Sequence, residues 1–136
     1  MPNPPDETLP IRSADDVVRV RQEVRKRAAA ASLGIVDQTK VITAASELAR
    51  NTLEYGGGGS AVVQTLVDGA RRGVRIIFED HGPGIADIEL ALKDGYTSGS
   101  GLGLGLGGAR RLCNEFSIES SPGKGTRVVI ARWKLT

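Results

Sequence analysis

The chain has 136 residues, a mass of 14.3 kDa and a formal net charge of +2, from 18 basic and 16 acidic side chains. This size predicts a single domain, and a charge so close to zero argues against a surface that binds the phosphate backbone of nucleic acids. One cysteine and one histidine exclude an intrachain disulfide and a metal centre built from several such residues. No apolar run approaches the roughly 20 residues of a membrane span, and no signal-peptide pattern is visible. We therefore expect a cytoplasmic protein without membrane or nucleic-acid partners.

The first elements are a strand and an amphipathic helix. Residues 1–8 are predicted to form a flexible tail, and residues 9–136 a single domain. A short edge strand over 9–12 precedes a helix that begins at Ser13, a good N-cap residue, and ends near Ser32. The polar face of this helix is basic, which suits either a solvated surface or a docking site for an acidic partner. It carries Arg19, Arg21, Arg25, Lys26 and Arg27.

A second helix is predicted from an N-cap at Asp37 to about Tyr55, where four consecutive glycines stop it. Two strands follow, over 61–67 and 74–80, and their short link suits an antiparallel hairpin.

The last part of the chain contains a short helix over 85–92, a glycine-rich stretch that opens a further helix, and a hairpin of 116–120 with 127–134. The order of the elements predicts a two-layer α/β sandwich. We expect a mixed, largely antiparallel sheet that is covered on one face by about three helices.

Glu47 and Asn51 form the first candidate site. They lie four residues apart in the second predicted helix, so their side chains share one face. Considered alone, the pair is explained more simply by two solvent-exposed polar residues. Asparagine is a poor helix former, however, and its neighbours Ala49 and Leu53 are small or apolar. This favours a partly enclosed polar site.

The second candidate is Asp80-His-Gly-Pro-Gly84, at the end of an apolar strand. A tight turn would use the same residue types. A binding site would use the carboxylate of Asp80 and two glycines that let a planar ligand approach the backbone. The local sequence does not separate these two interpretations, and His81 is expected to be a partly exposed turn residue.

The third candidate is the stretch Gly99-Ser-Gly-Leu-Gly-Leu-Gly-Leu-Gly-Gly108. Leucine at every second position argues against a disordered linker. Glycine-rich backbone that enters a helix is a typical phosphate site. Gly103, Gly105 and Gly108 match the dinucleotide pattern G-x-G-x-x-G, but no strand precedes them, and the phosphate-loop pattern G-x-x-x-x-G-K-[ST] is absent.

Four motifs follow one another in a specific order. They are Glu-x-x-x-Asn on a helix, Asp-x-Gly-x-Gly after a strand, Gly-x-Gly-Leu-Gly-Leu opening a helix, and Gly-Thr before the last strand. Together they resemble the GHKL ATPase/kinase family, which uses the Bergerat nucleotide-binding fold. The resemblance extends over about residues 9–134. It implies an ATP-dependent phosphotransferase with ATP and Mg²⁺ as cofactors.

The resemblance also implies a role for each matching position. Asn51 would hold Mg²⁺ through its side-chain oxygen. Glu47 would be the catalytic residue, as the general base or as the group that orients the attacking hydroxyl or water. Asp80, supported by Thr126, would accept the amino group of adenine. Residues 95–100 would form a lid. The remaining ATP-binding positions, which would bring backbone close to the nucleotide, are Gly82, Gly84, Gly101, Leu102, Gly103, Leu104 and Gly105.

From the length of 136 residues we expect none of the large additional domains of several family branches. The one histidine lies within the Asp80–Gly84 motif, which leaves no phosphoacceptor for a sensor kinase. What remains is the anti-sigma-factor serine/threonine-protein kinase group. Glu47-Leu-Ala-Arg-Asn51 and Asp94-Gly-Tyr-Thr-Ser-Gly look most like its stressosome switch kinase. That resemblance implies phosphorylation of a STAS-domain protein, with a PP2C-type phosphatase or a sigma factor as further candidate partners. The alternative is a nucleotide-gated binding module, an anti-sigma factor or phosphatase activator with little kinase activity.

Overall fold

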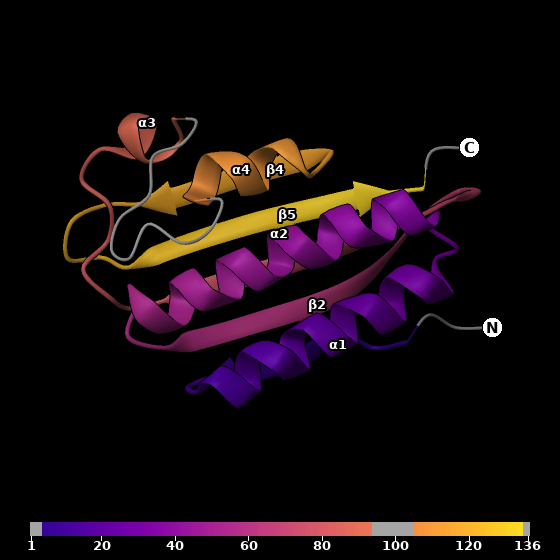
Figure 1. Ribbon diagram of the computed structural model, residues 1–136, viewed down its shortest axis with the longest axis horizontal. Helices are drawn as coiled ribbons and strands as arrows, with labels where there is room; N and C mark the ends of the chain where they lie inside the picture. The colour runs from indigo at the N-terminus through magenta and orange to yellow at the C-terminus, as the bar shows by residue number, and fades with distance from the viewer. Residues whose placement is uncertain (1–3, 94–104, 135–136) are drawn as a thin grey trace.

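The computed structural model describes residues 4–93 and 105–134, and its framework is a five-stranded sheet (Figure 1). The strand order is β1-β2-β3-β5-β4, and each pairing in the described residues is antiparallel. The expected two-layer sandwich is confirmed, although these pairings are antiparallel throughout instead of mixed. The strands are β1 (Glu7–Ile11), β2 (Gly59–Asp68), β3 (Arg71–Asp80), β4 (Glu115–Ser120) and β5 (Thr126–Trp133).

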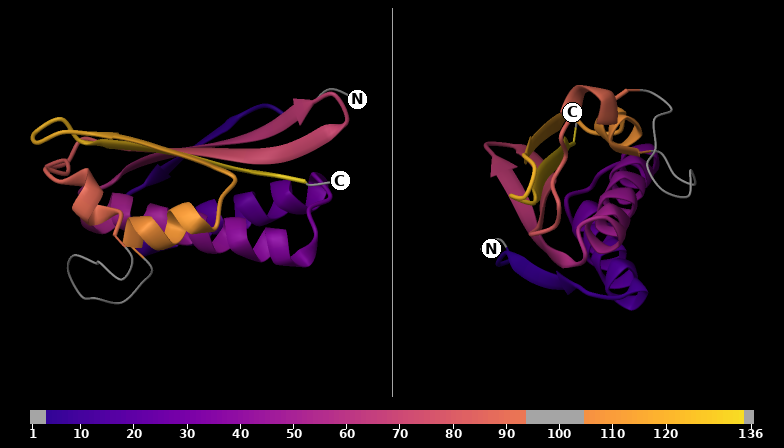
Figure 2. Two further views of the ribbon diagram at one scale, coloured as in Figure 1. Left: turned by 90° about the horizontal axis from the view of Figure 1, so that it is seen from above. Right: turned by 90° about the vertical axis from the view of Figure 1, so that its left-hand side faces the viewer.

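Helices cover one face of this sheet, and its other face carries none in the described part (Figure 2). The two long helices α1 (Ala14–Ala30) and α2 (Ile35–Glu54) lie side by side, and the shorter α4 (Gly105–Arg111) packs against α2. A single turn, α3 (Ile88–Ala91), lies beside α4 at one end of the molecule. The three helices expected over the sheet are therefore α1, α2 and α4.

The core fills the space between the helices and the sheet. Alternate residues of the central strands point to the helices, as the period of two along a strand requires. Fully burying one such apolar side chain contributes about 1.5–3 kcal/mol, so this layer dominates the stability of the fold. Its largest fully buried members are Phe78, Ile11, Leu48, Ile76, Ile130, Val20, Val24, Val41, Val63 and Val74.

The helix starts differ in how well the sequence predicts them. Ser13 caps α1 as expected, because its hydroxyl accepts from the backbone N–H of Asp16 at 3.3 Å. The predicted cap at Asp37 is wrong, since α2 begins at Ile35 after an N-cap at Gly34. Asp37 lies inside the first turn, where its Oδ1 accepts from Nη2 of Arg132 at 2.6 Å and so ties α2 to β5.

The N-terminal segment is more ordered than expected. The predicted tail over 1–8 is wrong at its end, because Glu7 and Thr8 already pair with β2. Before them, the carbonyl of Pro5 accepts from Nη2 of Arg27 at 2.7 Å. Arg27 is only 5% exposed and also pairs with Glu23, so it does not belong to the exposed basic face of α1.

Candidate functional site

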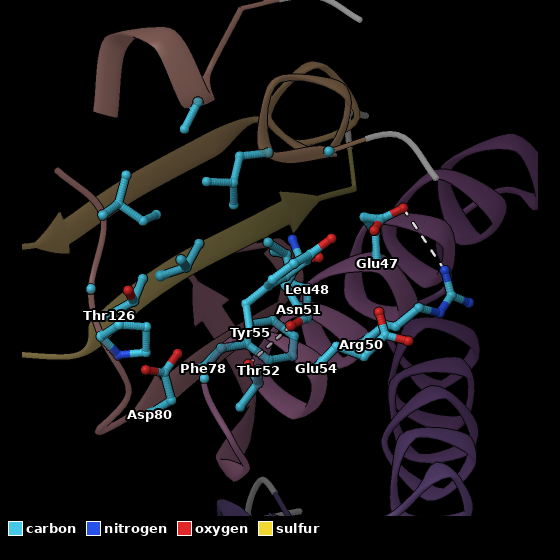
Figure 3. A pocket seen from close by; sticks show the side chains of 18 of the residues that line it. Glu47, Leu48, Arg50, Asn51, Thr52, Glu54, Tyr55, Phe78, Asp80 and Thr126 are labelled. Atoms are coloured by element: carbon cyan, nitrogen blue, oxygen red, sulfur yellow. Dashed lines mark hydrogen bonds and ion pairs between the residues drawn. The ribbon is translucent and has the colours of Figure 1, made fainter. Parts of the chain in front are cut away.

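A cavity of about 430 Å³ lies between α2, the ends of β3 and β5, the α3 turn and the start of α4. Figure 3 shows its lining side chains, which come from segments far apart in the sequence. Ligand pockets of small molecules have volumes of about 300–1,000 Å³, so this cavity has the right size. Of the predicted site residues, it is lined by Glu47, Asn51, Asp80, Gly84, Gly105 and Thr126.

Glu47 and Asn51 line the α2 side of the cavity, one helical turn apart (Figure 3). Glu47 is 7% exposed, and its Oε1 lies 3.9 Å from Nη1 of Arg50, whose side chain is partly exposed. Asn51 is half-buried. The prediction of a partly enclosed polar pair is therefore confirmed, and the pair offers a carboxylate and an amide oxygen, the hard oxygen donors that Mg²⁺ prefers.

Asp80 and Thr126 lie together at the strand end of the cavity. They face each other in the register of β3 with β5, so their Cβ atoms are about 4.5–5.5 Å apart. The Oδ1 atom of Asp80 accepts from the backbone N–H of Gly82 at 2.9 Å, which orients the carboxylate. This cross-strand pair joins two residues that the sequence predicts separately.

The glycines after β3 have different roles. Gly84 lines the cavity, and its φ of +76° together with the carbonyl of Ser121 leaves no place for a Cβ. Gly82, which is predicted to let a base approach, is not among the described lining residues of this cavity. A Cβ there would lie 2.7 Å from the carbonyl oxygen of Gly56, so this glycine serves chain packing and the hydrogen bond to Asp80.

The glycine-rich stretch enters the described structure at Gly105, where α4 begins and lines the cavity. The predicted binding residues Gly101, Leu102, Gly103 and Leu104 lie outside the described residues, as does the expected lid over 95–100.

Sequence reasoning did not identify the apolar walls of the cavity. Tyr55 at the end of α2 also borders it, and Gly56 follows directly. For the apolar lining residues, the sequence offers only their regular spacing within strands and helices. This spacing predicts that they are buried but does not say what they face. His81, which was expected to be a turn residue, is exposed and does not line the cavity. The apolar lining residues are Leu48, Phe78, Pro83, Ile85, Ala86, Leu90, Ala91, Leu106 and Val128.

Cys113 lies away from the cavity, after α4. Burial raises the pKa of its thiol from 9.0 to about 12, and the positive charge of Arg132 opposes this only in part. The thiol is therefore neutral at physiological pH and unsuited to nucleophilic chemistry. Among the described residues, no group of three or more His, Cys, Asp and Glu side chains is arranged to hold a metal, and no helix is long and apolar enough to cross a membrane.

Comparison with known proteins identifies the family. Residues 36–136 match the family described as histidine kinase-, DNA gyrase B-, and HSP90-like ATPase. The chain belongs to this ATPase family. Described residues of each of the four motifs line the cavity.

Two relatives indicate to which group of this ATPase family the chain belongs. The chain is 43% identical to the serine/threonine-protein kinase RsbT of Bacillus subtilis (strain 168), over 87% of this chain and 89% of that protein. It is 31% identical to an anti-sigma F factor of Clostridium novyi (strain NT), over 69% of each protein. These relationships confirm the expected enzyme class, a serine/threonine-protein kinase of the anti-sigma-factor group.

A solved structure supports the fold alone. The crystal structure of the RsbU and RsbW domains of Rv1364c from Mycobacterium tuberculosis matches 95% of this chain with a TM-score of 0.65 and 20% sequence identity. The match spans 32% of that longer chain, so it concerns one of its parts.

Proposed function

We propose that this kinase uses Mg²⁺-ATP bound in the cavity to phosphorylate a serine or threonine of a STAS-domain protein in the cytoplasm. The observation that carries the proposal is the arrangement of the cavity. One side offers the carboxylate of Glu47 and the amide of Asn51, and the strand end offers Asp80 and Thr126. A nucleotide likewise carries polar groups at two ends, the triphosphate and the edge of its base.

The strand end is proposed to hold adenine. An ionised carboxylate only accepts hydrogen bonds, so Asp80 suits the exocyclic amino group of this base. Its orientation is held by the N–H of Gly82. The apolar side chains of Phe78, Ile85 and Val128 would exclude water around the planar ring.

The α2 side is proposed to hold the phosphates. Asn51 would bind Mg²⁺ through its side-chain oxygen, and the metal would neutralise charge on the phosphates of the nucleotide. Glu47 would accept the proton of the attacking hydroxyl, since its carboxylate lines the cavity one turn from Asn51. The backbone N–H groups of Gly101, Gly103 and Gly105, with Leu102 and Leu104 between them, are proposed to bind the phosphate oxygens.

The relatives support the choice of partner. One is named a serine/threonine-protein kinase and another an anti-sigma F factor. A STAS-domain substrate is therefore our first proposal, and a PP2C-type phosphatase or a sigma factor is a further partner. The second name also favours an alternative function, a nucleotide-gated binding module that grips its partner and transfers little phosphate.

Transfer of label tests the proposal. The protein is incubated with γ-labelled ATP, Mg²⁺ and candidate STAS-domain proteins. We expect label on the partner, and Glu47→Gln should lower its rate by about 10²–10⁴-fold while ADP affinity is kept, because a general base contributes about that much. Glu7→Gln, an exposed carboxylate on β1, is the matched control.

The other outcomes are distinct. Free phosphate without a labelled partner would indicate a hydrolase. Nucleotide-dependent capture of a sigma factor with no transfer would favour the binding module. Full activity of the Glu47→Gln variant would remove this residue from its proposed role.

A further inference from the structure

The hydroxyl of Ser120, at the end of β4, is the centre of a small hydrogen-bond network. Its Oγ accepts from the backbone N–H of Ile85 at 2.8 Å and donates to the carbonyl of Gly125 at 3.0 Å. It also lies 2.8 Å from Oγ1 of Thr126. Ser120 therefore joins the loop after β3, the end of β4 and the start of β5.

Counting hydrogens determines the direction of the third bond. A serine hydroxyl has one hydrogen to donate and two lone pairs to accept with. The N–H of Ile85 can only donate and the carbonyl of Gly125 can only accept, so Ser120 gives its hydrogen to Gly125. All three contacts are hydrogen bonds only if Thr126 donates to Ser120. The opposite direction would leave the Gly125 carbonyl without this donor.

This direction has a consequence inside the cavity. Thr126 donates the single hydrogen of its hydroxyl to Ser120, so this hydroxyl can only accept a hydrogen bond from a ligand. Asp80 lies directly opposite Thr126 in the register, and its carboxylate also only accepts. Both residues line the cavity. The side chains of Asp80 and Thr126 are therefore a pair of hydrogen-bond acceptors at the strand end of the cavity.

We propose that Ser120 is a positioning residue that makes the site selective for 6-amino purines over 6-oxo purines. This inference rests on the proposed nucleotide function. An amino group has two hydrogens to give to Asp80 and Thr126, whereas an oxo group would place a further acceptor against them. If Ser120 loses its hydroxyl, that of Thr126 becomes free to turn and donate, and the oxo group is tolerated.

The ratio of the affinities for ADP and IDP measures this selectivity, since IDP replaces the 6-amino group by an oxo group and the acceptor N1 of adenine by an N1–H. Isothermal titration calorimetry with Mg²⁺ should show a clear preference for ADP in the parent protein. In Ser120→Ala the preference should fall on the order of ten-fold, the effect of about one hydrogen bond gained by IDP. A merely structural role of Ser120 would weaken both nucleotides equally and leave the ratio unchanged.

Two variants serve as controls. Ser120→Thr keeps the hydroxyl and should keep the parent ratio. Ser117→Ala removes an exposed hydroxyl from the same strand and should also keep it. An unchanged ratio in Ser120→Ala, or an equal fall in Ser117→Ala, would overturn the inference.

Thr126→Val tests the direction of the bond without changing Ser120. If the hydroxyl accepts from the ligand, this variant should lose ADP affinity and keep or improve IDP affinity. A larger loss for IDP than for ADP would mean that Thr126 donates, and the inference would be wrong. A parent protein that binds ADP and IDP equally well would refute this inference. A parent protein that binds neither nucleotide would refute the proposed function itself.

Discussion

Gly56 is the residue whose substitution tests the base end of the cavity most directly. It follows α2 and does not have a positive φ, so its backbone conformation is open to alanine. A Cβ there would nevertheless lie 2.5 Å from both Cβ and Oδ2 of Asp80. Non-bonded carbon atoms prefer about 3.5–4.0 Å, so Asp80 would have to move by about 1 Å.

The expected magnitude follows from the contacts of Asp80. A shift of that size breaks its 2.9 Å hydrogen bond with the N–H of Gly82 and moves the carboxylate away from the proposed base. Hydrogen bonds to charged groups contribute about 1.5–3 kcal/mol each. We therefore expect Gly56→Ala to weaken ADP binding by about 10- to 100-fold.

Calorimetric titration with ADP provides the measurement, and urea unfolding shows whether the variant is folded. Gly34→Ala is the matched control, because a Cβ at Gly34 meets nothing within 4 Å. An ADP affinity of Gly56→Ala equal to that of the parent would refute the reasoning, because it would mean that Asp80 can move without cost or does not contact the nucleotide.

Three further predictions concern single contacts. Asp80→Asn replaces an acceptor by an amide and should weaken ADP binding at least ten-fold in the same titration; unchanged affinity would exclude Asp80 from the base site. Arg132→Met removes two hydrogen bonds to Asp37 and should lower the free energy of unfolding by about 1–3 kcal/mol, whereas the exposed Arg25→Met should leave it nearly unchanged. Cys113 should resist alkylation in the folded protein at pH 8 and react only after unfolding. Because the pKa of Cys113 is raised in the folded protein, its contribution to the free energy of unfolding is complete below about pH 9 and falls as the pH rises towards 12. Cys113→Ala should therefore flatten the dependence of the unfolding free energy on pH in this range. A pH dependence identical to that of the parent would contradict this.

Local spacing explains which predictions were confirmed. Glu47 and Asn51 are one helical turn apart, so helix geometry alone puts them on one face, and the structure places both at the cavity. The hairpins and the Ser13 cap depend on neighbouring residues and were confirmed for the same reason.

Two wrong predictions concern side chains whose residue type suits more than one structural role. Asp37 has a typical N-cap side chain, yet Gly34 caps α2 and the carboxylate pairs with Arg132. Arg27 fits a basic helix face, yet it is buried because Glu23 and the carbonyl of Pro5 satisfy its guanidinium. In both cases a partner far away in the chain contributes to the role, Arg132 for Asp37 and the carbonyl of Pro5 for Arg27, and such a partner is not visible in the local pattern.

The amino-acid sequence by itself determined the order of the elements, the residues that share a face within each one, and the four motifs that indicate the ATPase family. Only the tertiary structure decided that Asp80 faces Thr126, that Gly56 makes room for Asp80, and that the hydroxyl of Ser120 lies 2.8 Å from that of Thr126. The physical reason is the range of the interactions. Helix and turn geometry act over a few residues, whereas strand register and close backbone approach join positions far apart in the chain. The direction of the hydrogen bond between Ser120 and Thr126 is inferred from the other partners of Ser120, which only the folded chain brings together.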